Sequence, residues 1–263
     1  MQVVQAYANG LFNWVDLSTT DQEAAKTFYG GLFGWECEDV PTDRGPLYTM
    51  CKINGYTVAG IGPLPPDLLA QGVPPFWSSY VKHDDVDGIA TKIGAAGGTV
   101  IMPPMDVMNE GRMLMATDPT GATFGVWQPK DHIGAQLVNM PNTLFWNELQ
   151  THDLDAAQAF YAAVFGWTSQ ADENGYVLVA ADGRMQAGMM AIEPEWGEVP
   201  PNWSVYFNVA AVETAVAKAQ ELGGTVLVMP KPVGDMGQLA VVQDPQGGVF
   251  TVMESNQVDA PPG

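Results

Sequence analysis

The chain carries the same segment twice, and this internal repeat restricts its possible folds more than any other feature. Residues 11–36 read LFNWVDLSTTDQEAAKTFYGGLFGWE, and residues 144–168 read LFWNELQTHDLDAAQAFYAAVFGWT. Aligning Phe28 with Phe160 gives an offset of 132 residues (160 − 28). Solenoid repeats are only about 20–50 residues long, so this spacing predicts a duplicated domain.

The later part of each copy repeats as well, with a slightly shorter offset. WSSYVKHDDV at 77–86 corresponds to WSVYFNVAAV at 203–212, a step of 126 residues (203 − 77). Farther on, MATDPTGATFGVWQ at 115–128 corresponds to VVQDPQGGVFTVME at 241–254. The change of offset indicates that the two copies differ in the length of a loop.

Each copy is itself built from two similar quarters. Residues 11–18 alternate like a half-buried strand, and a helix follows over 22–33, capped by Thr20 or Asp21 and ended by Gly34. Three short strands complete the quarter, near 35–39, 46–52 and 55–62. The next quarter keeps the order, with a strand at 77–82, a helix at 85–95 and strands at 98–102, 111–117 and 122–128.

The whole pattern predicts an α+β fold of four βαβββ modules in two tandem domains. The predicted first domain spans residues 9–130, with modules at 9–64 and 75–130 and a linker at 131–140. The second spans residues 141–256, with modules at 141–192 and 201–256 and a tail at 257–263. One helix per module covers only one face of its sheet, so the free faces should form cup-shaped mixed sheets around a ligand. The sequence leaves open whether a cup forms within one domain or between the two.

The composition narrows the classes of partner. Apolar residues make up 46% of the chain, and the formal net charge is −20, from 30 acidic and 10 basic residues. Such a field repels phosphate groups, so we expect no nucleic-acid and no membrane partner. No apolar segment approaches the roughly 18 residues of a membrane span, and the N-terminus lacks the basic region of a signal peptide. We therefore expect a cytoplasmic monomer or homodimer with a small-molecule ligand.

The two cysteines, Cys37 and Cys51, fall on neighbouring predicted strands. If residues 35–39 and 46–52 form a hairpin, the two side chains could lie opposite each other. Two cysteines do not make a disulfide framework, so we expect a pair of reduced thiols.

The chain resembles the vicinal oxygen chelate superfamily, which includes glyoxalase I, fosfomycin and bleomycin resistance proteins, and extradiol dioxygenases. The resemblance covers residues 9–256 and rests on the strand–Asp–helix–FY–G runs, on the DDVD segment at 84–87, and on the DPTG and DPQG turns. The chain looks most similar to two-domain actinobacterial proteins described as glyoxalase-like or hydroxylase-like. The resemblance implies two glyoxalase-like domains and, in catalytic members, one divalent metal held by His, Gln and Glu.

The metal-ligand positions of the superfamily, transferred one at a time, do not carry metal ligands here. They fall at Trp14, Ser78 and Gly125 in the first domain and at Trp146, Ser204 and Thr251 in the second. Indole and glycine side chains offer no ligand atom, and isolated hydroxyls are poor ligands. We therefore predict no metal and no cofactor at these positions, and a divalent metal held by other residues stays an alternative.

Alternation along the strands places further residues on the same faces. Asp16 shares a face with Trp14, and Glu148 shares one with Trp146. Burial would raise the pKa of such a carboxylate and suit it to general acid–base catalysis. The alternative is a structural carboxylate in a filled cup, with the two tryptophans as core plugs. The predicted ligand-binding residues are Trp14, Ser78, Tyr80, Arg112 and Trp127 in the first domain and Trp146, Ser204, Tyr206, Gln238 and Met253 in the second.

Arg112 and Gln238 occupy corresponding positions, so the two cups should differ there. As one of only three arginines, Arg112 could anchor a ligand carboxylate or pair with Asp16 or Glu148. The histidines are too scattered for a metal site, and we expect surface or capping positions for His83, His132 and His152.

Two functions follow from these observations. The first is a glyoxalase-like lyase or hydroxylase-like enzyme that acts on a small carbonyl or polyketide-like aromatic molecule, with Asp16 and Glu148 as the acid–base groups. The second is a binding protein that sequesters a flat or cationic ligand, as bleomycin-resistance relatives do. A metal-dependent glyoxalase or dioxygenase with an altered site is a further alternative.

Overall fold

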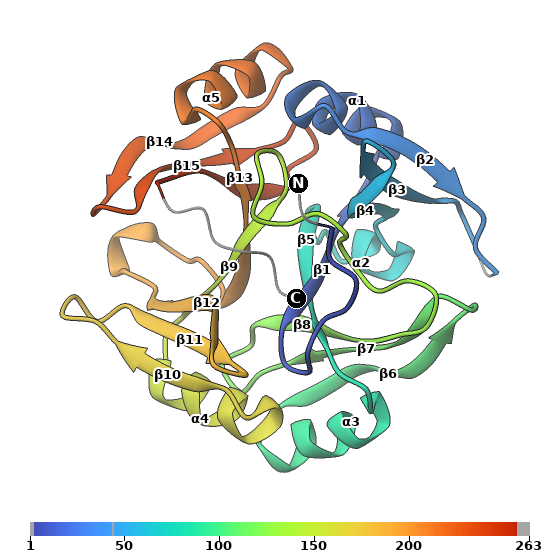
Figure 1. Ribbon diagram of the computed structural model, residues 1–263, viewed down its shortest axis with the longest axis vertical. Helices are drawn as coiled ribbons and strands as arrows, with labels where there is room; N and C mark the ends of the chain where they lie inside the picture. The colour runs from blue at the N-terminus through green and yellow to red at the C-terminus, as the bar shows by residue number, and fades with distance from the viewer. Residues whose placement is uncertain (1–2, 44, 257–263) are drawn as a thin grey trace.

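Two eight-stranded sheets make up the fold, and each comes from one copy of the repeat (Figure 1). The computed structural model describes residues 3–43 and 45–256, so the predicted tail at 257–263 lies outside the described residues. The first sheet contains β1 (Phe12–Thr19), β2 (Glu36–Val40), β3 (Tyr48–Ile53), β4 (Tyr56–Pro63), β5 (Phe76–Lys82), β6 (Thr99–Val107), β7 (Gly111–Thr117) and β8 (Thr123–Pro129). The second contains β9 (Leu144–Thr151), β10 (Thr168–Ala171), β11 (Val177–Ala181), β12 (Arg184–Ala191), β13 (Asn202–Asn208), β14 (Thr225–Val233), β15 (Gly237–Gln243) and β16 (Val249–Ser255).

Both sheets have the same topology. The strand orders are β2-β3-β4-β1-β5-β8-β7-β6 and β10-β11-β12-β9-β13-β16-β15-β14. At the centre of the first sheet, β1 runs antiparallel to β5 and parallel to β4, while β5 runs parallel to β8. Since the first strands of two modules meet there, each cup forms within one copy of the repeat. The prediction of an α+β fold, with four βαβββ modules in two cup-shaped mixed sheets, is confirmed.

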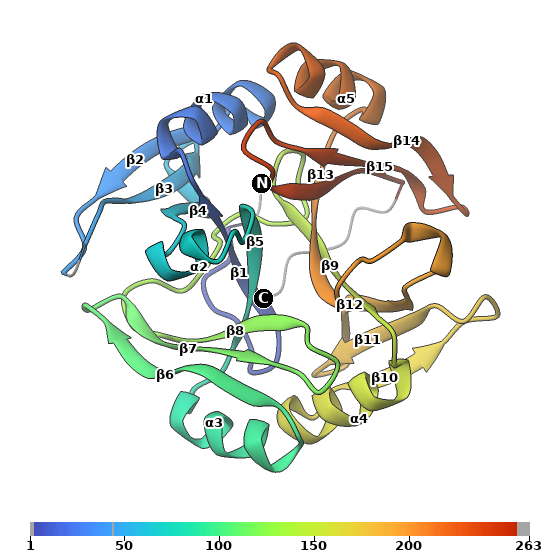
Figure 2. The same ribbon diagram turned by 180° about the vertical axis from the view of Figure 1, so that it is seen from behind.

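The helices cover the convex face of each sheet and leave the concave face free. The longer ones are α1 (Gln22–Phe33), α3 (Val86–Ala95), α4 (Leu154–Phe165) and α5 (Val212–Glu221), and two short ones, α2 (Pro66–Ala70) and η1 (Pro194–Trp196), lie between modules. Figures 1 and 2 show α1 beside α5 and α3 beside α4, so the sheets lie back to back with their concave faces turned outward. None of the helices among the described residues is long and apolar enough to cross a membrane.

Local sequence sets the bounds of α1 where they were predicted. The carboxylate of Asp21 accepts a hydrogen bond from the Ala24 N–H at 2.9 Å, so Asp21 rather than Thr20 is the cap. Gly34 ends the helix in the left-handed region, with a φ of 71°. The corresponding residue Asp153 caps α4 in the same way.

Two features differ from the predicted elements. The strand expected to end at residue 102 continues as β6 through Pro103 and Pro104 to Val107. Proline removes a donor from the ladder, but β6 is an edge strand, and its open side tolerates the loss. Both α2 and η1 start with a proline and bury no residue, so apolar periodicity gave no signal for them.

The FY pairs of the repeat join the two halves. Tyr29 of α1 donates a hydrogen bond to Asp244 in the β15–β16 turn at 2.8 Å, and Tyr161 of α4 donates to Asp118 in the β7–β8 turn at 3.1 Å. The Trp77 indole donates in turn to the Tyr29 hydroxyl at 3.1 Å. Each half therefore supplies a tyrosine to a buried aspartate of the other, and this reciprocal contact fixes the back-to-back arrangement.

Cys37 and Cys51 lie directly opposite each other on β2 and β3. Their Sγ atoms are 3.8 Å apart, and both thiols are free. Cys51 is buried, and Cys37 is partly exposed. The hydrogen bond between the two thiols is the main cause that lowers the pKa of Cys37. The pair is thus a cross-strand contact between thiols.

Candidate functional site

A hydrogen-bonded chain of aromatic side chains holds one carboxylate in cup 1, the concave face of the first sheet. The Trp14 indole donates to the Tyr48 hydroxyl at 3.1 Å, and that hydroxyl donates to Asp16 at 3.1 Å. From the other side, the Tyr80 hydroxyl donates to the same Asp16 oxygen at 3.2 Å. Cross-strand pairing puts Asp16 opposite Ser78, so these five side chains share one face of the sheet.

The same arrangement recurs in cup 2, the concave face of the second sheet. The Trp146 indole donates to the Tyr176 hydroxyl at 3.0 Å, and Tyr176 donates to one oxygen of Glu148 at 3.0 Å. Tyr206 donates to the other oxygen at 2.7 Å. Glu148 is paired with Ser204 across β9 and β13. The predicted face of each of these residues is therefore correct, whereas Tyr48 and Tyr176 were missed.

The two missed tyrosines reach their carboxylates across a glycine. A Cβ placed at Gly60 would lie 1.8 Å from the Tyr48 hydroxyl, and one at Gly188 would lie 1.8 Å from the Tyr176 hydroxyl. Gly188 is paired with Glu148, so the missing side chain leaves the space that the tyrosine fills. In both copies the glycine follows the tyrosine by 12 residues (60 − 48 and 188 − 176). This shared spacing was the available sequence signal.

Replacing Gly188 with Ala is expected to push Tyr176 away from Glu148. Because the added methyl group overlaps the hydroxyl, the free energy of unfolding should fall by about 1–3 kcal/mol. Loss of the Tyr176 hydrogen bond should also raise the pKa of Glu148 further, since that bond lowers it. Urea unfolding and carboxyl titration by NMR measure both effects. Gly94→Ala, where a Cβ meets nothing within 4 Å, is the control, and equal behaviour of the two variants would contradict the packing argument.

Burial raises the pKa of both carboxylates. For Asp16, burial raises the pKa to about 6, against the opposing effect of the Tyr48, Tyr80 and Ser78 hydrogen bonds. Burial likewise raises the pKa of Glu148, against hydrogen bonds led by those of Tyr206 and Tyr176. Carboxyl groups in this condition can give or take a proton nearer neutral pH than exposed ones do.

The linker closes cup 1. The imidazole of His132 lies against Trp14, with ring centres 4.4 Å apart, and against Trp127 at 5.6 Å. The Trp127 indole donates to the His132 carbonyl at 2.8 Å, and Asn13 donates to the Ile133 carbonyl at 2.9 Å. The expectation that His132 occupies a surface or capping position is wrong, because these long-range contacts carry the linker into the cup.

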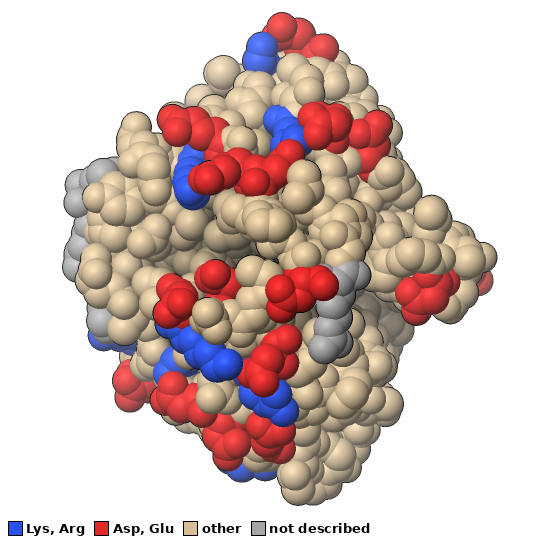
Figure 3. Space-filling model, turned by 90° about the vertical axis from the view of Figure 1, so that its right-hand side faces the viewer, with Lys and Arg blue, Asp and Glu red and all other residues tan. Residues whose placement is uncertain are grey.

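The environment of His132 keeps its ring neutral. Burial lowers the pKa of the imidazole to about 4, and its Nε2 atom is buried without a hydrogen-bond partner. Trp14 beneath it is only 4% exposed. Figure 3 shows this side of the molecule, where charged side chains gather in groups and leave an uncharged band between them. In cup 1 the chain's own imidazole therefore covers the indole of Trp14.

The indole and hydroxyl positions are more exposed in cup 2: Trp146 and Ser204 are partly exposed, whereas Trp14 and Ser78 are buried. The carboxylates differ in the opposite sense, with Asp16 partly exposed and Glu148 5% exposed. Met253 is buried on the same face, two residues from Thr251, which pairs with Tyr206. Cup 2 thus has a partly exposed indole beside a buried carboxyl group.

The metal-ligand positions of the superfamily come together but do not suit a metal. Tyr80 pairs with both Trp14 and Gly125, and a Cβ at Gly125 would lie 2.2 Å from the Tyr80 ring. The tyrosine ring therefore covers the third position. Within residues 3–43 and 45–256, no group of three or more His, Cys, Asp or Glu side chains could hold a metal ion. An indole, a hydroxyl and a glycine are not a donor set for a divalent cation.

Arg112 and Gln238 do not face the cups, so their predicted ligand-binding positions are wrong. The Arg112 guanidinium pairs with Asp87 of α3 at 2.9 Å and with Asp106 at 3.4 Å, on the helix-covered face. Gln128, the cross-strand neighbour of Arg112, accepts a hydrogen bond from the first backbone N–H of α3. Met113, which follows Arg112 in the strand, is paired with Trp127 and faces the cup. The structure thus places Arg112 on the face opposite to the predicted one. The Gln238 amide donates a hydrogen bond to Glu254 at 3.4 Å. The same Glu254 oxygen accepts a hydrogen bond from the first backbone N–H of α5.

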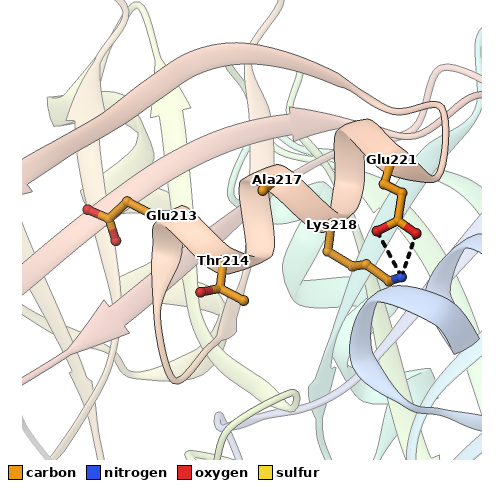
Figure 4. Close-up of a pocket in the computed structure, with 5 residues that line it drawn as sticks. All are labelled: Glu213, Thr214, Ala217, Lys218 and Glu221. Atoms are coloured by element: carbon orange, nitrogen blue, oxygen red, sulfur yellow. Dashed lines mark hydrogen bonds and ion pairs between the residues drawn. The ribbon is translucent and has the colours of Figure 1, made fainter.

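A separate hollow lies on the exposed face of α5 (Figure 4). It is lined by Glu213, Thr214, Ala217, Lys218 and Glu221, all from one helix, and Lys218 pairs with Glu221 at 3.1 Å. With no side chain from a second element and no buried polar group, this surface is a solvated helix face rather than a catalytic site.

Comparison with known proteins finds relatives along almost the whole chain. Residues 11–126 match the Glyoxalase/Bleomycin resistance protein/Dioxygenase superfamily, and residues 146–253 match the Glyoxalase-like domain. The provisionally named glyoxylase CFP32 of Mycobacterium tuberculosis (strain CDC 1551 / Oshkosh) is 46% identical over 254 residues, which cover 94% of this chain and 96% of that protein. Anthracycline biosynthesis protein DauV of Streptomyces sp. (strain C5) is 34% identical over 261 residues, which cover 94% of each.

Solved structures share the same architecture. The Mn(II)-bound glyoxalase from Novosphingobium aromaticivorans has a TM-score of 0.64 and 15% identity, over 97% of this chain and 89% of that one. The 2,3-dioxygenase LapB from Pseudomonas sp. KL28 has a TM-score of 0.66 and 13% identity, over 96% and 95%. At such identities the likeness concerns the fold alone. From the two family matches and the full-length relatives, the chain belongs to the glyoxalase/bleomycin resistance protein/dioxygenase superfamily, with two glyoxalase-like domains in tandem.

Proposed function

We propose that the chain binds a small, flat, carbonyl-containing molecule in cup 2 and exchanges a proton with it through Glu148. One observation carries this proposal: a buried carboxyl group with a raised pKa, held by two tyrosine hydroxyls, lies beside a partly exposed indole. The indole of Trp146 offers a face on which a planar ligand can stack. In cup 1, His132 covers the corresponding indole, so one ligand binds per chain.

The hydrogen bonds of Glu148 suit it to proton exchange. As an acid, the carboxyl group gives its proton to a carbonyl oxygen, and the remaining carboxylate is stabilised by the Tyr176 and Tyr206 hydroxyls. As a base, it accepts an acidic proton of the ligand and becomes the neutral acid that burial favours. Both directions need only side chains of this chain, so the proposed reaction is independent of a metal.

The relatives support a small-molecule ligand. DauV is named for anthracycline biosynthesis, and CFP32 carries a provisional glyoxylase name, so the names point to a polycyclic aromatic and a small carbonyl compound respectively. An aromatic wall with one proton-exchanging carboxyl group accommodates either chemistry. The partly exposed indole of Trp146, a surface on which a planar ring can stack, favours the aromatic class.

The second candidate function is capture of a ligand without turnover. It is favoured by the donor chemistry at the metal-ligand positions of the superfamily, where indoles and hydroxyls replace ligands. In that case Glu148 would serve as a hydrogen-bond partner for the ligand, and Tyr176 and Tyr206 would hold the Glu148 carboxyl group in place.

Glu148→Gln separates the two functions. For an enzyme, removing the exchangeable proton should lower turnover by about 100-fold or more while binding persists. For a capture protein, only affinity should change, within about tenfold. The measurements are Trp fluorescence titration with an anthracycline and product formation from it and from the methylglyoxal–glutathione hemithioacetal. Glu213→Gln, on the exposed face of α5, is the matched control.

Two results would contradict the proposal. One is unchanged binding and turnover in Glu148→Gln together with loss of both in a cup 1 variant. The other is stoichiometric zinc, nickel or iron in the purified protein, with hemithioacetal turnover that a chelator abolishes and the metal restores.

A further inference from the structure

Lys231 lies on the cup 2 face of the second sheet. It pairs with Leu239, which pairs with Met253 in the next strand. Met253 alternates with Thr251, which is paired with Tyr206. Residues paired directly across strands point to the same face. The Lys231 side chain therefore projects from the same concave face that carries Glu148, on the edge strand β14 that borders the cup.

The positive charge of Lys231 acts on the buried carboxyl group of Glu148. Burial raises the pKa of Glu148, and the charge of Lys231 acts in the opposite direction and lowers it. Lys231 itself is exposed, and no Asp or Glu of the described residues forms an ion pair with it. The Lys231 ammonium group is therefore available to an anionic ligand at the edge of cup 2.

The corresponding residue of cup 1 is Met105, 126 residues earlier (231 − 105). Met105 pairs with Met113, so it faces cup 1 in the same register. At this position of the edge strand, cup 2 therefore carries a cation where cup 1 carries a thioether.

A ladder of neutral polar groups extends the site away from Glu148. Gln150 donates to Glu148 at 3.4 Å, and Asn202 donates to Gln150 at 3.4 Å. In the first sheet, Ser18 corresponds to Gln150 and Phe76 corresponds to Asn202, and these two residues are also cross-strand partners. Cup 1 therefore lacks both amide side chains. Among the described residues, cup 2 therefore combines a buried carboxyl group, two amide groups and the Lys231 ammonium group.

We propose that Lys231 selects ligands that carry a carboxylate, with the carboxylate on the ammonium group and the aromatic carbonyl end against Trp146 and Glu148. This inference rests on the proposed function of cup 2, and it adds the charge of the ligand. An ammonium–carboxylate contact at the edge of a cavity adds charge-assisted hydrogen bonds that a neutral amide lacks.

The test compares aromatic acids with their own primary amides, using one-, two- and three-ring pairs and Trp fluorescence. The wild-type chain should bind each acid about five- to tenfold more tightly than its amide, and added salt should reduce the difference. Lys231→Met, which installs the residue found in cup 1, should abolish the preference, and Lys231→Glu should reverse it. Lys92→Met removes another exposed lysine that has no ion pair, on α3, and should keep the preference.

The outcomes separate this inference from the proposed function. If acids and amides bind cup 2 equally well in the wild-type chain, or Lys231→Met keeps the preference, Lys231 does not select carboxylates, and the function of cup 2 stands. If no pair binds, or if Trp146→Phe leaves the fluorescence response intact, the ligand site is not cup 2, and both proposals fail. Circular dichroism of each variant shows whether the fold is retained.

Discussion

Asp244→Ala is expected to lower the free energy of unfolding by about 3–5 kcal/mol, because it leaves several buried donors without an acceptor. One oxygen of Asp244 accepts from the backbone N–H groups of Gln246, Gly247 and Gly248 at 2.8–2.9 Å. The other accepts from Tyr29 of the opposite half at 2.8 Å. The side chain is 3% exposed, so water cannot readily replace it.

Urea unfolding measures this loss of stability, and Tyr29→Phe is the variant with which Asp244→Ala is compared. The phenylalanine variant removes only the hydrogen bond between the halves and leaves the turn intact, so its cost should be smaller, about 1–3 kcal/mol. Asp118→Ala, which breaks the equivalent turn and its contact with Tyr161, should match Asp244→Ala. A cost for Asp244→Ala no larger than that of Tyr29→Phe would show that the turn hydrogen bonds contribute little.

Asp16→Asn is expected to stabilise the protein above pH 6 by about 2 kcal/mol. Burial raises the pKa of Asp16 from 3.8 to about 6, so the folded state holds the proton more tightly than the unfolded chain. The ionised carboxylate therefore costs stability above pH 6, and this cost disappears as the pH falls from 6 to 3.8. The amide oxygen of asparagine can still accept from Tyr48 and Tyr80, which both donate to one carboxylate oxygen.

Thermal or urea unfolding between pH 3.5 and 8 tests this sign. The gain of Asp16→Asn should be near zero at pH 3.5 and largest at pH 8. Asp39→Asn should behave in the opposite way, because the Lys26 ammonium and Thr49 lower the pKa of Asp39 and its carboxylate stabilises the fold at neutral pH. A loss of stability in Asp16→Asn at pH 8 would mean that Asp16 is a structural anion.

The central strands of each cup were predictable because alternation acts locally. Trp14, Asp16 and Tyr80 lie on apolar strands that are each followed by a helix with a clear cap, and their faces followed from alternation along the strand. Arg112 lies on β7, where nothing in the strand itself fixed the register. A shift of one residue transfers every side chain to the other face, which placed Arg112 beside α3.

The sequence by itself determined the duplication, the four modules and the presence of a carboxylate among aromatic rings, since these depend on repeats and on periodicity within a few residues. Only the tertiary structure decided that Tyr48 and Tyr176 reach over glycines, that His132 covers Trp14 in one cup, and that Lys231 borders the other. Those contacts join residues far apart in the chain or on edge strands. Their geometry depends on how whole sheets curve and how the linker packs, which no local pattern encodes.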